Sequence, residues 1–134
     1  MMRVLALDYG SARCGCAVSD PTGSIVTPID PVARPASRRG LRALESLIRD
    51  RHVERVVVGL PLSLSGGDSG QTAEARSFAQ LLSERLGDRV PVEMHDERFT
   101  TALARRGTGG TTSSEDSRAA AHLLEGWLVS HRER

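Results

Sequence analysis

The sequence contains no lysine: all 18 basic side chains are arginines, against 17 acidic ones, so the formal net charge is only +1. Many nucleic-acid-binding proteins are strongly basic, and this chain lacks that signature. The low net charge weakens a nucleic-acid-binding interpretation without excluding it, because every arginine can form a two-pronged contact with a phosphate. Aromatic side chains are also scarce, with one tryptophan, one tyrosine and two phenylalanines. We therefore expect no stacking platform for single-stranded bases.

Long apolar runs are missing as well. No run approaches the roughly 20 apolar residues that cross a bilayer. Near the start, Asp8 follows only four apolar residues, too few for a secretory signal. We expect a cytoplasmic protein that makes no membrane contact, either a monomer or a homodimer. The length of 134 residues predicts a single domain over residues 1–134.

Cysteine is limited to two residues, Cys14 and Cys16. They lie two apart on an expected strand, where their side chains point the same way and their Cα atoms are roughly 7 Å apart. A disulfide at that separation would be strained. Two thiols without other Cys or His partners also make a poor zinc site. We expect both to be small buried side chains.

Hydrophobic patterning predicts strands first and alternating helices and strands later. The expected strands are 4–7, 14–19, 24–29, 55–59 and 90–95, and the expected helices are 37–51, 72–86, 100–106 and one that begins after a cap at residue 114. Prolines 28, 31 and 35 are expected to end the third strand. This order indicates an α/β fold with a mixed sheet, antiparallel in its first part and parallel later, covered by helices.

Carboxylates stand at three chemically informative positions. Asp8 ends the most apolar strand, and ligands bind at the carboxyl ends of strands in open α/β sheets. Asp96 and Glu97 follow another strand, with their side chains directed to opposite faces. Asp116 continues the apolar stripe of the last helix, which directs it toward the sheet. Each has a plain structural alternative: a turn former, a solvated acidic turn, or an acid in the first helical turn.

Three acids that converge from two strand ends and a helix start would form an all-oxygen site for Mg²⁺ or Mn²⁺. Such sites support phosphodiester cleavage. Glycines at 10 and 15 would let a phosphate or a metal approach the backbone closely. No Ser-His-Asp or Cys-His pattern competes, and His95 is the one histidine beside an acid cluster, where it could act as a general base.

Five short motifs occur in order over residues 3–129 and resemble those of the YqgF/RuvX-type family. The motifs are DYGSARCG at 8–15, VSD at 18–20, VGLPL at 58–62 with its glycine-rich continuation, DERFTT at 96–101, and DSRAA at 116–120. The family is RNase H-like, related to Holliday-junction resolvases and described as pre-16S rRNA nucleases. The resemblance implies an RNase H-like five-stranded mixed sheet, the first three strands antiparallel and the others parallel to the first.

The resemblance also implies catalytic and metal-binding roles for Asp8, Glu97 and Asp116, with Mg²⁺ or Mn²⁺ as cofactor. Under that hypothesis Arg13, Arg76 and Arg98 would bind phosphates of the nucleic-acid partner, although each could instead form a surface ion pair. The chain departs from the family pattern at two places. It has no basic residue shortly before Asp116, and its loop after residue 62 is slightly longer.

Several functions remain open at this stage. A metal-dependent nuclease acting on the 5′ end of pre-16S rRNA is the main hypothesis, and a branched-DNA endonuclease with the same chemistry is its alternative. A non-catalytic nucleic-acid-binding module fits the low charge and scarce aromatics. The first motif also resembles the phosphate turn of actin-like ATPases, but those proteins need two such domains. Composition further predicts a mobile loop over 107–114 and an exposed arginine stripe, Arg38, Arg42 and Arg49, that could contact phosphates.

Overall fold

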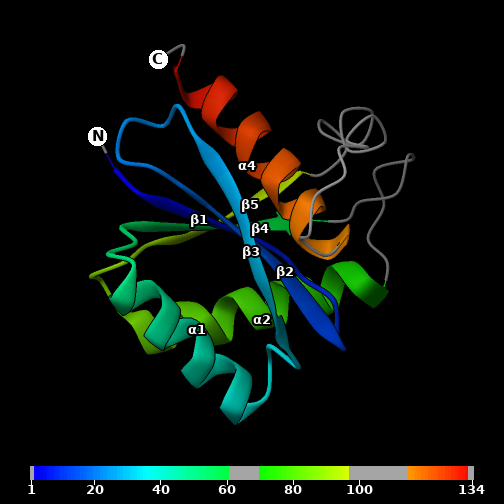
Figure 1. Cartoon of the computed structure of the whole chain (residues 1–134). Coiled ribbons are helices and arrows are strands. Elements are labelled where there is room, and N and C mark those ends of the chain that lie inside the picture. Colours follow the sequence, from blue (N-terminus) through cyan, green and yellow to red (C-terminus); the bar gives the residue numbers. More distant parts are fainter. Residues whose placement is uncertain (1, 61–69, 97–114, 133–134) are drawn as a thin grey trace.

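The fold was analysed in a computed structural model that describes residues 2–60, 70–96 and 115–132. Its elements follow the order expected for an α/β protein (Figure 1). The strands are β1 (Val4–Asp8), β2 (Arg13–Ser19), β3 (Val26–Ala33), β4 (Arg55–Leu60) and β5 (Val92–Asp96), and the helices are α1 (Arg38–Asp50), α2 (Gly70–Leu86) and α4 (Glu115–Arg132). The expected helix at 100–106 and the expected mobile loop at 107–114 lie outside the described residues.

The strands form one sheet in the order β3-β2-β1-β4-β5. β1 pairs with β2 and β2 with β3 in antiparallel fashion, whereas β1 with β4 and β4 with β5 are parallel. Short turns connect the antiparallel strands, while the parallel pairs need crossovers such as the one through α2. The predicted mixed sheet, antiparallel first and parallel later, is confirmed.

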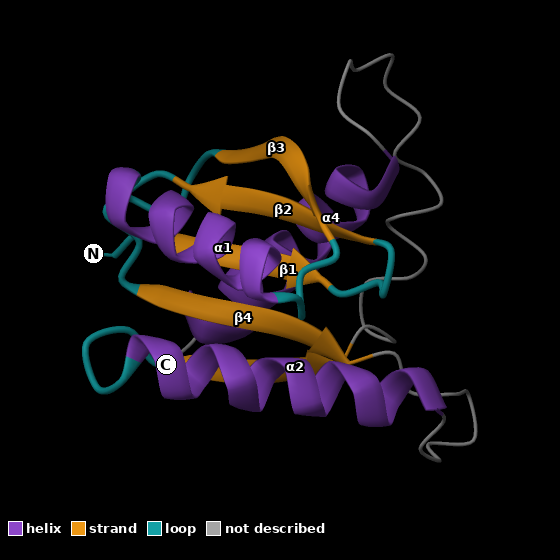
Figure 2. Ribbon diagram, turned by 90° about the horizontal axis from the view of Figure 1, so that it is seen from below, coloured by secondary structure: helices purple, strands orange, loops and turns teal. Residues whose placement is uncertain are grey.

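Helices cover both faces of the sheet. Helices α1 and α2 lie on one face and α4 on the other (Figures 1 and 2). Leu5 and Leu7 of β1 pack toward α1 and α2, and Val4 and Ala6 pack toward α4. All four side chains are fully buried. The central strand is therefore apolar at every position before Asp8 because it has a helical layer on each side.

Local signals in the sequence set several element boundaries. Ser37 caps α1, its hydroxyl accepting a hydrogen bond from the Gly40 amide at 3.0 Å. In the β2–β3 turn, the Asp20 carbonyl accepts from the Gly23 amide at 3.0 Å, as the predicted turn requires. Cys14 and Cys16 are buried thiols in the core beneath α1 and α2, as expected. No helix in the described ranges is long and apolar enough to span a membrane.

The prediction for the third strand was wrong. The prolines were expected to end it, yet β3 continues through Pro28 and Pro31 as far as Ala33. β3 lies at the edge of the sheet, where it pairs only with β2. An edge strand tolerates proline, since a residue without an amide proton can face away from the neighbouring strand. The strand also carries a register irregularity opposite residues 14–16 of β2, a position where proline is also tolerated.

Candidate functional site

Asp8 lies at the carboxyl end of β1, in the centre of the sheet. Because Val4 and Ala6 pack beneath α4, the alternation of side chains along the strand directs Asp8 to the α4 face. Its side chain is partly buried, and its backbone is in register with Gly15 of β2. The structure thus places this acid at the sheet edge that the sequence predicted, called the carboxyl edge below.

The strands β4 and β5 end at the same edge. Leu7 is in register with Val58 of β4, and Leu60 of β4 is in register with Asp96 of β5. The last residue of β5 therefore lies two strands away from Asp8 along the sheet. Glu97, the next residue in the chain, is outside the described residues, and so is Arg98.

Ser117 fixes the start of α4 over this part of the sheet. Its fully buried hydroxyl accepts a hydrogen bond from the Cys16 amide at 3.3 Å and donates to the Ile29 carbonyl at 2.5 Å. Cys16 and Ile29 are register partners in β2 and β3, so the hydroxyl bridges two neighbouring strands of the sheet. Cys16 is also paired with Leu7, the neighbour of Asp8. The first turn of α4 is thereby held beside the end of β1.

Asp116 is the second residue of α4 and directly precedes Ser117. The predicted stripe of this helix is confirmed, since Ala120, Leu123 and Trp127 are all buried against the sheet. The placement of the Asp116 carboxylate itself is not described. Sequence reasoning assigned no role to Ser117; the available signal was a polar residue three positions before Ala120, on the buried side of the stripe.

The far half of α4 is fixed by a second set of polar contacts, around Glu93 of β5. The Trp127 indole donates to Glu93 at 2.8 Å, and Arg55 of β4 pairs with the other carboxylate oxygen at 2.5 Å. His131 stacks on Trp127 with ring centroids 3.9 Å apart. Polar contacts thus join α4 to the sheet near both of its ends.

The turn that follows Asp8 depends on Gly10. A Cβ at this position would lie 2.6 Å from the carbonyl oxygen of Arg13, closer than Cβ atoms normally approach backbone. The glycine is thus required by the turn itself, and not only by a ligand as the sequence suggested. Next to Asp8, Tyr9 stacks on Phe78 of α2 with centroids 4.9 Å apart. Burial, with smaller effects of Glu74 and Cys14, raises the pKa of Tyr9 above its ordinary value.

Two of the three predicted phosphate-binding arginines are described, and both are exposed. Arg13 is the first residue of β2, so it stands at the carboxyl edge with Asp8. Arg76 belongs to the first half of α2, the helix that follows the carboxyl end of β4. Both residues take part in interactions with other groups. Arg76 lies in the α1 and α2 layer, whereas Asp8 faces α4, and phosphate binding by either arginine stays a prediction.

No cluster of three His, Cys, Asp or Glu side chains suited to a metal occurs among the described residues. This absence does not bear on the predicted set, because Glu97 and the Asp116 side chain lie outside the described part of the chain. The set itself consists of three carboxylates, which are ligands suited to Mg²⁺ and Mn²⁺. His95, the residue before Asp96, is partly buried and has an interaction partner.

Solved structures of junction resolvases share this fold. RuvC of Thermus thermophilus in complex with a Holliday junction substrate superposes with a TM-score of 0.65, at 13% identity, over 98% of this chain and 96% of that one. The Holliday junction resolvase of fowlpox virus gives a TM-score of 0.60 at 11% identity, over 96% and 99% of the two chains. At these identities the likeness concerns the fold, which confirms the predicted RNase H-like class.

Comparison with similar sequences identifies the family of the chain. The chain is 37% identical to the "Putative pre-16S rRNA nuclease" of Corynebacterium jeikeium, over 97% of this chain and 88% of the relative. It is 46% identical to the protein of the same description from Koribacter versatilis, over 78% and 67% of the two chains. The family model described as "RuvX: Holliday junction resolvase" matches residues 2–130, and the chain therefore belongs to the RuvX family.

Proposed function

We propose that this protein is a nuclease that hydrolyses phosphodiester bonds in structured nucleic acid, and that its substrate is the 5′ end of pre-16S rRNA. The relatives described as pre-16S rRNA nucleases support the reaction and the substrate. We further propose a cytoplasmic location, where precursor rRNA would be processed, and one RNase H-like domain over residues 1–134, since the family match extends over residues 2–130. The observation that carries the proposal is the convergence of β1, β5 and α4 at the carboxyl edge of the sheet.

The residues present fit a divalent cation. Asp8 reaches this edge from β1, on the α4 face. On β5, Glu93 contacts Trp127 of α4, so the strand alternation places His95 on the α4 face. Glu97 follows two residues later in the chain. The hydrogen bond between the Cys16 amide and the Ser117 hydroxyl holds Ser117 over β2, and Asp116 is the residue before it. Asp8, Glu97 and Asp116 would hold Mg²⁺ or Mn²⁺ with oxygen ligands alone.

A divalent cation held by Asp8, Glu97 and Asp116 would supply polarisation of the phosphodiester and easier ionisation of a water molecule. The protein's part is to position these groups. Asp8 supplies a fixed carboxylate at the end of a rigid central strand, and Ser117 is a positioning residue for the first turn of α4. Arg13 and Arg76, together with Arg98, would bind the phosphates on either side of the cleaved bond as two-pronged donors.

Incubation of the purified protein with precursor 16S rRNA and with a four-way DNA junction, side by side in Mg²⁺, Mn²⁺ or EDTA, tests this function. Metal-dependent trimming of the rRNA at its 5′ end is the expected result. Cleavage of the junction alone would favour the second candidate, a branched-DNA endonuclease, which the RuvC-like fold supports. Binding without cleavage of either substrate would leave a non-catalytic module and contradict the proposed nuclease.

A further inference from the structure

A cavity of about 280 Å³ lies between the carboxyl-terminal ends of α1 and α2. Its lining includes the residues that precede β4 and β5, so it opens at the opposite edge of the sheet from Asp8. We call it the helix-end groove. The charged and titratable side chains that line it are Glu45, Arg49, His52, Arg85 and Arg89.

The groove is positively charged. Arg85 pairs with Glu45 at 2.7 Å, so these two charges offset each other and tie α2 to α1. Arg49 approaches Asp50 at 3.8 Å, but both side chains are 73% exposed, and a pair of that kind is weak. Arg89 is exposed on the segment after α2. Arg49 and Arg89 therefore leave a net excess of positive charge at a concave surface.

His52 has an unusual backbone conformation at the mouth of this groove. Its φ of 56° lies in the left-handed region that favours glycine. His52 lies in the turn that follows α1, where its amide donates to the Arg49 carbonyl at 3.2 Å. A glycine at this position would relieve the strain but would remove the imidazole from the groove. This conformation belongs to the turn that ends α1, in which the Val53 amide also donates to the Ile48 carbonyl at 2.9 Å. The turn places the exposed imidazole of His52 in the lining of the groove.

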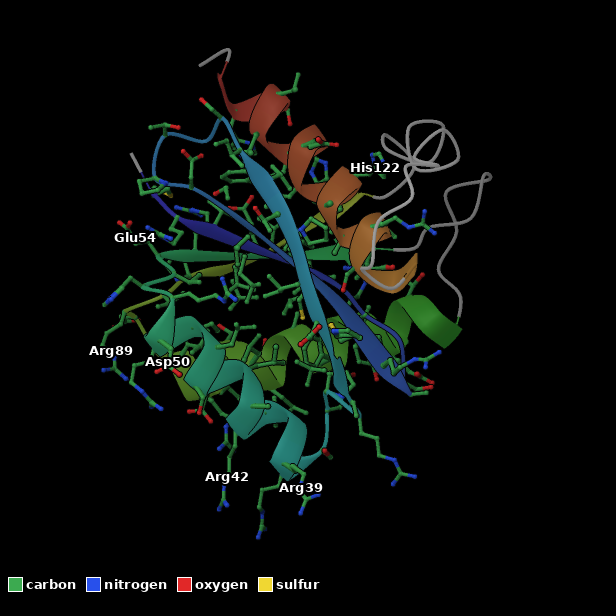
Figure 3. The ribbon with its side chains drawn as sticks, viewed as in Figure 1. Arg39, Arg42, Asp50, Glu54, Arg89 and His122 are labelled. Atoms are coloured by element: carbon green, nitrogen blue, oxygen red, sulfur yellow. The ribbon has the colours of Figure 1, made fainter. Side chains whose placement is uncertain are left out.

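Further arginines lead away from the groove along α1. Arg38, Arg42 and Arg49 are exposed and lie four and seven residues apart, which places them along one side of the helix. The buried residues Leu41, Leu44 and Ile48 lie on a different side of the helix. Figure 3 shows Arg42 extending away from α1 into open space, with Arg89 and Asp50 near the other end of the helix. We call Arg38, Arg42 and Arg49 the α1 arginine track.

We propose that the helix-end groove and the α1 arginine track bind backbone phosphates of a nucleic acid, at a site separate from the carboxyl edge. The donors are arginine and histidine, which suit phosphate oxygens, and no Phe, Tyr or Trp among the described residues lines the groove for base stacking. The site therefore recognises the backbone and not the base sequence.

The position of the groove limits which substrate can use it. β4 runs the full height of the sheet from the groove to the carboxyl edge, and six residues of strand span about 20 Å. The groove also lies on the α1 and α2 layer, whereas Asp8 faces α4. A short oligonucleotide at the carboxyl edge would not reach it. A folded RNA with a second helical segment would reach both the carboxyl edge and the groove. This inference rests on the proposed function and specifies a large, structured RNA as the substrate.

Binding of an RNA duplex of about 30 base pairs, measured in EDTA across a range of salt concentrations, tests the site. The double variant Arg49→Gln/Arg89→Gln should weaken binding and lower the slope of log affinity against log salt by roughly two units. Arg3→Gln removes one positive charge from a residue outside both the groove and the α1 arginine track, and it should leave the slope nearly unchanged. A double variant whose slope change per charge removed equals that of Arg3→Gln would overturn the proposal. Because no metal is present, this result does not depend on whether the protein cleaves RNA.

Variants of His52 separate binding from stability. His52→Gly should raise the melting temperature, because strain is relieved, and yet weaken duplex binding several-fold. His52→Asn, which tolerates the left-handed conformation, should keep the melting temperature near that of the wild type and weaken binding equally. Unchanged binding in both variants would remove His52 from the site. Equal affinity of the wild type for polyglutamate of matched charge would overturn the assignment to nucleic acid in favour of an acidic protein partner.

Discussion

The hydroxyl of Ser117 in α4 accepts a hydrogen bond from the backbone amide of Cys16 in β2, 101 residues earlier in the chain. The same hydroxyl donates to the carbonyl of Ile29, so one side chain satisfies a buried donor and a partly buried acceptor on two strands. Asp116 is the adjacent residue. A contact that stabilises the fold is therefore also the contact that sets where a proposed catalytic carboxylate enters the site.

Ser117→Ala should lower both stability and cleavage. The buried Cys16 amide and the partly buried Ile29 carbonyl would lose their shared partner, at a cost of about 1–3 kcal/mol in the free energy of unfolding. Cleavage should fall further than the unfolded fraction explains, with the loss in kcat, because the first turn of α4 loses its anchor. Urea unfolding and steady-state kinetics measure the two effects. Ser130→Ala, which removes an exposed hydroxyl from the same helix, is the control and should change neither.

Gly40→Ala should destabilise the protein although alanine favours helices. A Cβ at Gly40 would lie 2.1 Å from the Arg34 carbonyl oxygen and 2.7 Å from the Cα of Pro35, so backbone would have to move. Overpacking of this kind costs about 1–3 kcal/mol, which exceeds the gain of up to about 1 kcal/mol in helix propensity. Gly87→Ala is a useful comparison, because its φ of 66° is strained for alanine but the space is open. A smaller loss is expected for Gly87→Ala, measured by thermal unfolding; a gain for Gly40→Ala would contradict the steric argument.

Much of this architecture follows from local sequence. The apolar run before Asp8 predicts a strand covered on both faces, and the structure shows Leu5 and Leu7 on one side and Val4 and Ala6 on the other. The cap at Ser37 and the turn at Asp20 are likewise set by residues within a few positions of each other. Where the physical cause of an element is local, the sequence alone was sufficient to predict that element.

Features that depend on distant parts of the chain could not be predicted in this way. Whether prolines end a strand depends on which neighbours it pairs with, and β3 tolerates Pro28 and Pro31 because it is an edge strand. The Ser117 bridge and the helix-end groove join segments that lie far apart in sequence. The left-handed conformation of His52 is set by how α1 leads into β4, and no residue type at that position signals it.

The Asp20 carboxyl provides a test in acid solution. It accepts hydrogen bonds from the Thr22 hydroxyl and from the amides of Ile25 and Ser24, and these lower its pKa from 3.8 to about 2. A depressed folded-state pKa contributes stability that is complete above the unfolded value and is lost as the pH falls through about 2. The wild type should therefore lose stability more steeply than Asp20→Asn as the pH falls from about 4 to 2. A carboxyl titration followed by NMR should give a midpoint near 2 for Asp20; a midpoint at 3.8 would contradict the turn geometry.

Asp8→Asn should abolish cleavage without unfolding the protein. If Asp8 shares a site with Glu97 and Asp116, removal of its charge relieves repulsion in the metal-free protein, so the melting temperature should equal or exceed that of the wild type. Cleavage should fall by at least about a hundredfold, the scale observed when one preorganised group is removed from an active site. Asp50→Asn makes the same chemical change at an exposed position on α1 and should cleave a short substrate at the wild-type rate. Normal cleavage by a folded Asp8→Asn protein would remove Asp8 from the site.

Cleavage should require Mg²⁺ or Mn²⁺ and should be lost in Ca²⁺ even where Ca²⁺ binds. Calcium accepts oxygen ligands at about 2.3–2.6 Å in a loose geometry, whereas magnesium demands about 2.0–2.1 Å and an octahedral arrangement. Displacement of the reacting groups by a few tenths of an ångström is enough to slow a positioned reaction strongly. Binding of precursor rRNA should persist in Ca²⁺, so gel-shift and cleavage assays on the same samples separate the two steps. Equal cleavage rates in Ca²⁺ and Mg²⁺ would rule out a tightly positioned metal at Asp8, Glu97 and Asp116.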